Sequence, residues 1–161
     1  MRIHIAADYL GYELARQLED WLKASHEVIW HAADEYDEGD DYPIYCARVG
    51  QSVIQDEDNG LDTFGVVVGG SGTGEVIAIN KVKGIRAALA VAPPQVAGGR
   101  RVENINAIVI SIHLSDLEKA KGLVSAAIDT NYEGTVDSAR RIINIGEYEN
   151  RGTIEGWSVE G

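Results

Sequence analysis

Short runs of branched apolar residues alternate with longer amphipathic segments along the chain. Segments such as 12–25 and 42–57 place apolar residues three and four positions apart, which is the spacing of one helix face. Five runs have the length and composition of buried strands: 2–7, 27–32, 64–68, 86–91 and 107–112. Strands that alternate with helices are typical of βαβ units. The pattern therefore predicts an α/β fold, a doubly wound three-layer sandwich around a five-stranded parallel sheet.

Two helix starts carry capping signals. Ser115 and Glu118 have the spacing of a capping box, which would open a helix over 117–128. Thr135 is the expected N-cap of a last helix over 136–148.

The chain has the size and composition of one globular domain. Its 161 residues are 45% hydrophobic, which favours a folded core. We expect residues 1–150 to form this α/β domain and residues 151–161, with three glycines and little periodicity, to form a C-terminal tail. No apolar run approaches the roughly 20 residues of a membrane span, and the N-terminus lacks the apolar core of a signal peptide. These features predict a cytoplasmic protein with no membrane partner.

The charge and the metal-ligating residues narrow the function classes. A formal net charge of −12 disfavours nucleic acid as a partner, and an anionic substrate would need local cations or helix ends. Cys46 cannot form an internal disulfide, and the four histidines lack zinc-ligand spacing, so no metal is expected. The acidic run 34–43 is best explained as a solvated loop. A calcium loop is the alternative, although EF-hand spacing is absent.

The stretch VVVGGSGTGEVIAINK, residues 66–81, has the order strand, glycine turn, helix. This order is typical of many anion-binding sites. A Walker A loop would need a Gly-Lys-Ser/Thr ending, but the first lysine is Lys81. A dinucleotide fingerprint would need a third glycine where Glu75 stands. Both phosphate-loop interpretations are therefore disfavoured.

The same turn is suited to proton transfer. Gly70, Ser71 and Gly72 would leave backbone N–H groups facing an oxygen that becomes negative during a reaction. Glu75 begins the following helix, whose dipole favours the charged carboxylate. A carboxylate beside such donors is what proton abstraction next to a carbonyl requires. The simpler alternative stays open: the glycines only permit tight packing, and Glu75 is an ordinary first-turn acid.

Four stretches of the sequence together resemble one known family. They are IAADYLGYELA, DDYP, GGSGTGEVIAINKVKGIRAALA and ARRIINIGEYE. They resemble type B ribose-5-phosphate isomerase, a family that includes galactose-6-phosphate isomerase, and the resemblance covers about residues 1–150. It implies a Rossmann-like sandwich that assembles as a homodimer or homotetramer. It also implies interconversion of aldose and ketose phosphates through an enediolate, without a metal or redox cofactor.

The resemblance assigns roles by position. Glu75 matches the base that moves the C2 proton in one branch of the family, whereas the other branch uses a cysteine at the position of Gly69. Asn104 matches an amide contributed across the dimer, and Arg141 matches a phosphate-binding arginine. The catalytic candidates are Glu75, Ser71 and Asp8. The candidates for binding the substrate are Tyr9, Tyr42, Gly70, Gly72, Gly74, Glu103, Asn104 and Arg141.

Several phosphate-binding positions of the family are changed in this chain. Tyr9 stands where the family usually has a histidine, and Glu103 stands where it has a ring-opening histidine. Leu114 and Asp137 fall where two further phosphate arginines are usual. Because a phosphate dianion needs charge-assisted donors, the set of cations for it is depleted. The remaining candidates are Arg100, Arg101, Arg140 and Arg141.

Three hypotheses follow. The chain is an isomerase of a sugar phosphate, with ribose 5-phosphate as the default substrate. Alternatively, it uses the same proton-transfer groups on a sugar with less phosphate or none. The third hypothesis is a non-catalytic subunit that needs a related isomerase-like chain as its partner. The complete proton-transfer set favours the first two hypotheses, and the depleted cations leave the substrate open.

Overall fold

The five predicted strands form one sheet. A computed structural model describes residues 1–154 and places the strands in the order β2-β1-β3-β5-β4. All four pairings are parallel. The strands are β1 (Arg2–Ala7), β2 (Glu27–Trp30), β3 (Thr63–Gly69), β4 (Ala87–Ala90) and β5 (Ala107–Ser111). Their boundaries differ from the predicted ones by two residues or fewer at each end, so the strand prediction is confirmed.

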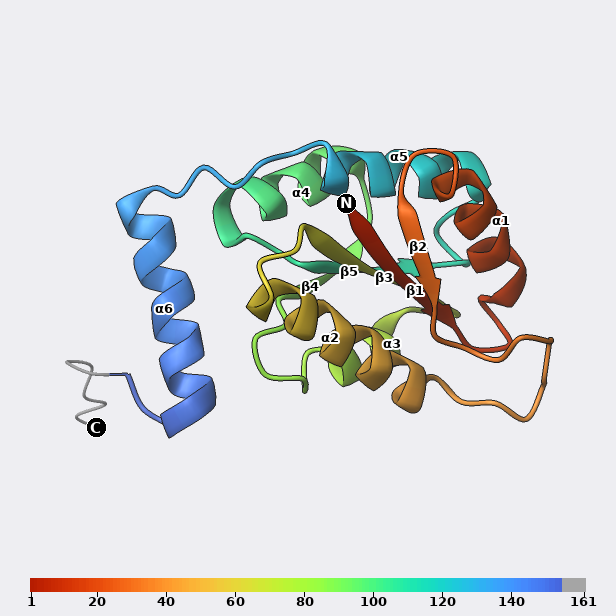
Figure 1. Cartoon of the computed structure of the whole chain (residues 1–161), viewed down its shortest axis with the longest axis horizontal. Helices are drawn as coiled ribbons and strands as arrows, with labels where there is room; N and C mark the ends of the chain where they lie inside the picture. Colours follow the sequence, from red (N-terminus) through yellow and green to blue (C-terminus); the bar gives the residue numbers. More distant parts are fainter. Residues whose placement is uncertain (155–161) are drawn as a thin grey trace.

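Helices cover both faces of the sheet (Figure 1). One face carries α1 (Tyr12–Leu22), α4 (Pro93–Gly98) and α5 (Leu117–Ile128), and the other carries α2 (Tyr42–Asp58) and α3 (Thr73–Ile79). The π-helical turn η1 (Gly99–Glu103) follows α4, and α6 (Val136–Arg151) ends the described chain. The structure is therefore the doubly wound, Rossmann-like three-layer sandwich that the sequence predicts.

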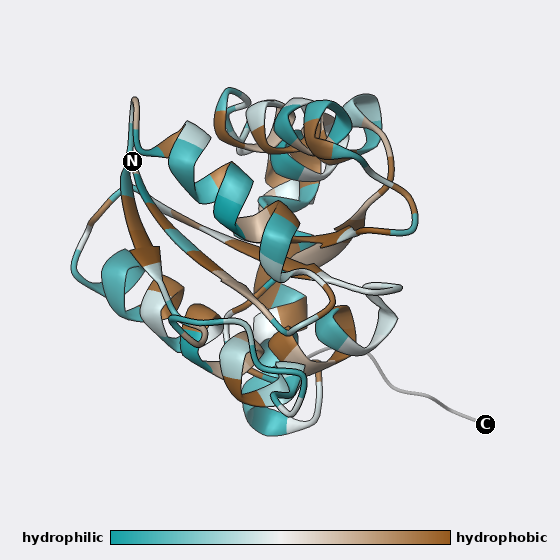
Figure 2. Ribbon diagram, turned by 90° about the vertical axis from the view of Figure 1, so that its right-hand side faces the viewer, coloured by the Kyte–Doolittle hydropathy of each residue, from teal (hydrophilic) through white to brown (hydrophobic). Residues whose placement is uncertain are grey.

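Two apolar clusters hold the layers together. Alternate residues of the central strands point to opposite faces, as the pleat requires. Val66 and Val68 pack toward α1 and α5, whereas Val67 packs toward α2 and α3. Figure 2 shows the hydrophobic strands between helices whose outer faces are hydrophilic. Burial on both faces explains why the strands read as nearly continuous apolar runs.

The start of α5 differs from the prediction. Asp116, and not Ser115, is the N-cap, and its Oδ1 accepts a hydrogen bond from Lys119 N at 2.9 Å. Ser115 is buried, and its hydroxyl has no hydrogen-bond partner in the described chain. The capping-box prediction is therefore wrong by one residue. The physical reason is that the helix begins at Leu117, so the carboxylate at position 116 is the group that reaches the third helical N–H.

The last helix lies at one end of the sandwich (Figure 1) and is bound to it at two points. Ser138 Oγ donates to the Val102 carbonyl, and Glu149 Oε2 accepts a hydrogen bond from Gly84 N at 2.8 Å. Thr135 caps α6 as predicted, since its Oγ1 accepts a hydrogen bond from Ser138 N at 3.3 Å. The helix continues to Arg151, three residues beyond the expected end. The expected domain boundary at residue 150 thus falls in its last turn, and residues 155–161 of the expected tail lie outside the described residues. Four large apolar side chains of α6 are exposed: Val136, Ile143, Ile145 and Tyr148.

Candidate active site

The order of the strands places the topological switch point of the sheet between β1 and β3. The connections from these neighbouring strands leave toward opposite faces, with α1 on one side and α3 on the other. Ligands of doubly wound sheets bind at the carboxyl ends of the strands at such a switch point. Asp8 directly follows β1, and the glycine turn directly follows β3. We call the residues at this place the carboxyl-edge group: Asp8, Tyr9, Tyr42, Gly70, Ser71, Gly72, Gly74 and Glu75.

Glu75 is the buried acid of this group. It lies in the first turn of α3, and its residue is only 4% exposed. Burial raises the pKa of the Glu75 carboxyl, and Asp8 and Asp41 raise it further, whereas hydrogen bonds from its own N–H and that of Gly70 lower it. The helix start was expected to favour the charged form, but desolvation outweighs it. A carboxyl with a raised pKa is suited to proton transfer near neutral pH.

Asp8 is a second buried carboxyl. Its Oδ1 accepts hydrogen bonds from the N–H groups of Leu10 and Gly11 at 3.1 and 3.3 Å. Burial raises the pKa of Asp8 despite these bonds, and Asp40 and Asp41 add to the shift. Asp40 also accepts a hydrogen bond from the Tyr9 N–H at 2.8 Å. The edge is therefore rich in carboxylates, which disfavours a dianionic group beside it unless another surface supplies cations.

The glycine turn offers donors for a negative oxygen. Ser111 Oγ donates to the Gly70 carbonyl at 2.7 Å and fixes the turn on β5. Ser71 Oγ accepts from Thr73 N at 3.2 Å. Within residues 1–154, no protein group accepts a hydrogen bond from the N–H of Ser71 or Gly72. Gly72 has a φ of 79°, a backbone conformation in which glycine is favoured. These two N–H groups have the chemistry of an oxyanion hole.

Aromatic and apolar side chains border the turn. The Tyr42 ring packs on Gly74 so closely that a Cβ there would lie 2.5 Å from the Tyr42 hydroxyl. Leu10 lies beside Gly70, where a Cβ would be 2.9 Å from Leu10 Cδ1. Leu10 itself is 44% exposed. Leu10 and Tyr42 thus pack directly on the turn, at Gly70 and Gly74 respectively.

Three expected site residues do not lie at this edge. Glu103 ends η1, Asn104 follows it, and Arg141 is exposed on α6. Asn104 precedes the start of β5, whereas Ser111 ends that strand beside Gly69. Six residues lie between Asn104 and Ser111, and seven steps of about 3.3 Å or less place Asn104 roughly 20 Å from the turn. We call Glu103, Asn104 and Arg141 the amino-edge group.

Asn104 is fixed by local contacts. Its φ of 47° is the one positive φ of a non-glycine residue in the described chain. Its Oδ1 accepts from Arg100 Nη1 at 3.3 Å, and its carbonyl accepts from Arg86 Nε at 2.9 Å. Arg100 also lies over the Phe64 ring, 5.3 Å from its centroid. Arg100 is therefore engaged in the fold, which argues against it as a phosphate ligand.

The other arginines near the amino-edge group face acids. Arg101 Nε lies 3.8 Å from Glu133 Oε1, and Arg140 Nη2 lies 3.2 Å from Asp137 Oδ1. Both pairs are solvent-exposed, so they are weak and leave the arginines able to exchange partners. No ion pair of Arg141 occurs among the described residues. Arg141 is the candidate phosphate ligand that has no competing acid.

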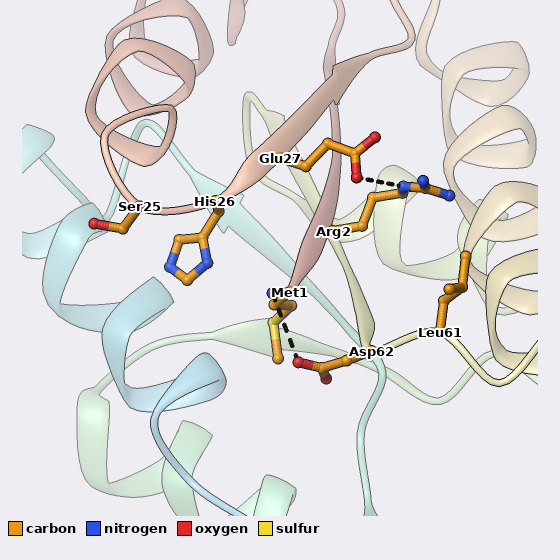
Figure 3. A pocket seen from close by; sticks show the side chains of 7 residues that line it. All are labelled: Met1, Arg2, Ser25, His26, Glu27, Leu61 and Asp62. Atoms are coloured by element: carbon orange, nitrogen blue, oxygen red, sulfur yellow. Dashed lines mark ion pairs between the residues drawn. The ribbon is translucent and has the colours of Figure 1, made fainter.

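A hollow at the amino edge of the sheet is separate from the carboxyl-edge group. It has a volume of about 360 Å³ and lies where the strands begin (Figure 3). Two ion pairs form among the residues that line it: Arg2 with Glu27, and the Met1 amine with Asp62. Its own charges are thus paired, and it lacks an acid–donor arrangement like that of the glycine turn.

Two kinds of feature, a membrane-spanning helix and a metal-binding cluster, are absent from the described residues. Residues 1–154 contain no helix with the length and hydropathy of a membrane span. The same residues contain no cluster of three or more histidine, cysteine, aspartate or glutamate side chains that could hold a metal ion.

Sequence reasoning missed two contributors to the carboxyl-edge group. Ser111 holds the turn, and Cys46 lies fully buried beneath it. Burial, together with the negative charges of Glu75 and Asp8, raises the pKa of the Cys46 thiol to about 12. The thiol therefore stays neutral and only fills space. Ser111 could have been noticed as the polar end of an otherwise apolar strand, whereas nothing in the sequence marks Cys46.

Comparison with known proteins gives the family. The family model described as Ribose/Galactose Isomerase matches residues 3–145. The chain is 37% identical over 150 residues to ribose-5-phosphate isomerase B of Mycobacterium tuberculosis, covering 92% of this chain and 90% of that one. It is 34% identical over 149 residues to a probable ribose-5-phosphate isomerase B of Mycoplasma genitalium, covering 91% and 95% of the two chains.

Solved structures agree with this assignment. The crystal structure of ribose-5-phosphate isomerase B from Mycoplasma genitalium with bound ribulose-5-phosphate superposes with a TM-score of 0.85 at 30% identity, covering 93% of this chain and 97% of that one. The type B enzyme of Trypanosoma cruzi gives a TM-score of 0.85 at 26% identity, covering 93% and 99%. With the matched family model and relatives above 30% identity over nearly the whole chain, the protein belongs to the ribose/galactose isomerase family.

Proposed function

We propose that the chain is an aldose–ketose isomerase of a sugar phosphate, with ribose 5-phosphate and ribulose 5-phosphate as the default pair. The observation that carries the proposal is the buried Glu75 carboxyl beside the unpaired N–H groups of Ser71 and Gly72, at the switch point of the sheet. A base next to an oxyanion hole is the arrangement that moves a proton next to a carbonyl. The similarity to ribose-5-phosphate isomerase B proteins supports this substrate class.

The reaction needs two proton transfers, one from C2 to C1 and one from O2 to O1. In the open-chain aldose, Glu75 accepts the C2 proton, and the electrons of that C–H bond form the C1–C2 double bond of an enediolate. The N–H groups of Ser71 and Gly72 stabilise its negative oxygen. Glu75 then donates the proton to C1, while a proton passes from the C2 hydroxyl to O1. Asp8, whose pKa is also raised, is the candidate for moving protons between oxygens.

The complete site requires a second copy of the chain. Asn104 of the amino-edge group lies roughly 20 Å from the glycine turn of the same chain, too far for both to touch one sugar phosphate. A partner that presents Asn104 and Arg141 to Glu75 would join the two groups and bring a cation to an acidic edge. The exposed apolar residues of α6 support a homodimer or homotetramer in which this helix packs on a neighbour. We propose this assembly, and a cytoplasmic location, as part of the function.

A second candidate function rests on the depleted cations. Leu114 is 46% exposed and Asp137 pairs with Arg140, at the positions where phosphate arginines were expected. The same proton transfer could therefore act on a sugar with less phosphate or none, or a related partner chain could supply the missing cations. Rates on ribose and ribose 5-phosphate, measured with the homogeneous protein, distinguish these alternatives from the first.

The direct test replaces the base. Glu75→Gln keeps the shape of the side chain and removes its basicity. We expect kcat for ribose 5-phosphate to fall by roughly 100-fold or more, with KM little changed. Glu118→Gln, which changes an exposed acid on α5, is the matched control and should keep full activity. Full activity of Glu75→Gln would exclude Glu75 as the base, and a wild-type protein inactive on all sugar phosphates would favour the non-catalytic subunit.

A further inference from the structure

Gly69 ends β3 immediately before the glycine turn, and the Glu75 side chain occupies the space beside it. A Cβ at position 69 would lie 1.8 Å from Glu75 Oε1, 2.3 Å from Cδ and 2.9 Å from Cγ. Real Cβ atoms do not approach other heavy atoms this closely. We propose that Gly69 is a positioning residue for the isomerase reaction, because its missing side chain creates the slot that holds the Glu75 carboxyl at the turn. This inference rests on the proposed function.

The contact of Gly69 with Glu75 is specific. Among the described glycines, Gly69 is the one whose Cβ would meet Glu75. The neighbouring Gly70 faces the end of the Leu10 side chain, and Gly74 faces the Tyr42 ring. Glycine at 69 is therefore not explained by turn geometry, since its own φ is not positive. It is explained by the carboxyl that fills its side-chain position.

The main chain around Gly69 cannot move aside easily. Gly69 pairs with Ser111 in the β3–β5 ladder, and its carbonyl accepts a hydrogen bond from Ile112 N at 3.0 Å. The flexible partner is the side chain of Glu75, which starts in the first turn of a short helix. A side chain at 69 would therefore push the carboxyl out of the slot and toward solvent. The base would lose both its burial and its position beside the turn.

Gly69→Ala tests this role by kinetics. We expect kcat for ribose 5-phosphate to fall at least 100-fold, with a much smaller change in KM, since the base is displaced and the binding groups stay. The double variant Gly69→Ala/Glu75→Gln should be no slower than Glu75→Gln alone, because both changes remove the same group. Gly122→Ala is the matched control, since its Cβ would meet only Pro93 Cγ at 3.9 Å. Gly69→Ala with kcat retained would overturn the proposal.

A second measurement does not depend on catalysis. Carbon-13 NMR titration of the Glu75 carboxyl, assigned with Glu75→Gln, should show a raised pKa in the wild type and a lower one in Gly69→Ala. An unchanged pKa would overturn the positioning role. If the wild type isomerises no substrate, this titration still decides the role of Gly69, while the proposed function fails separately. If Gly69→Ala does not fold, Gly69→Ala/Glu75→Ala should fold, because Cγ, Cδ and Oε1 are then absent; its failure to fold would also refute the slot.

Discussion

A partly buried chain of hydrogen-bonded polar groups predicts how the stability of the fold depends on pH. His4 Nδ1 lies 2.8 Å from His31 Nε2, and His4 Nε2 lies 2.9 Å from Asp56 Oδ2. Arg2 Nη1 donates to Asp56 Oδ1 at 2.9 Å. Burial, followed by the positive charges of His4 and Arg48, lowers the pKa of His31 from 6.5 to about 4. His31 therefore stays neutral in the folded chain at pH values where the unfolded chain protonates it.

The sign and size of the effect follow from this difference in pKa. Between about pH 6.5 and pH 4, His31 is protonated in the unfolded state and neutral in the folded state. The free energy of unfolding therefore falls as the pH decreases through this range. The full shift corresponds to about 3 kcal/mol. Because His31 is only half-buried, solvent screening reduces the expected loss to about 1–2 kcal/mol between pH 7.5 and pH 4.5.

Urea unfolding of the wild type and of His31→Gln, at equal protein concentration, measures this loss. Glutamine keeps a hydrogen bond to His4 and does not titrate. The free energy of unfolding of the wild type should fall by about 1–2 kcal/mol more than that of His31→Gln over this pH range. Asp8 and Glu75 act in the opposite direction, since their raised pKa values add stability as the pH falls. They are present in both proteins and cancel in the difference. Parallel pH profiles for the two proteins would refute the argument.

Two further predictions concern the phosphate site and the fold. Asp137→Arg should lower KM for ribose 5-phosphate about tenfold, because it replaces an acid by a charge-assisted donor; an unchanged KM in steady-state kinetics would place the phosphate elsewhere. Asp116→Ala should lower the free energy of unfolding by about 1 kcal/mol through the lost N-cap of α5. Ser115→Ala should change it by much less in the same urea titration, since the Ser115 hydroxyl has no partner in the described chain; the reverse order would restore the capping box.

Local chemistry explains which parts of the fold could be predicted. The strands are recognisable because burial on both faces demands continuous apolar runs such as Val66–Val68. The segment from Pro93 to Glu103 was not predicted as helical, since two prolines and two glycines conceal the helix signal of α4 and η1. The cap of α5 was misplaced by one residue because Ser115 and Asp116 are both good caps. Only the path of the chain into the helix selects Asp116.

The candidate site also has parts that the sequence predicts and parts that it does not. Glu75 and the glycine turn could be identified from strand, turn and helix order, and the sheet brings Asp8 beside them by topology alone. The raised pKa of Glu75 could not be predicted, because burial depends on side chains distant in sequence, such as Cys46. The sequence also does not reveal that Asn104 and the glycine turn lie at opposite ends of β5 within one chain. That separation depends on the parallel order of the strands, which is a tertiary property.

Mixing two inactive variants tests the central claim, an isomerase site shared between two copies of the chain. Glu75→Gln removes the base from the carboxyl-edge group, and Arg141→Ala removes the cation from the amino-edge group. After unfolding and refolding at equal amounts, half of the dimers should be mixed, and one of the two sites in each should be intact. We therefore expect about one quarter of the wild-type rate on ribose 5-phosphate to return. Glu75→Gln mixed with Asp8→Asn should recover nothing, because both changes fall in the same group. No recovery with Arg141→Ala, or equal recovery in both mixtures, would contradict the shared site.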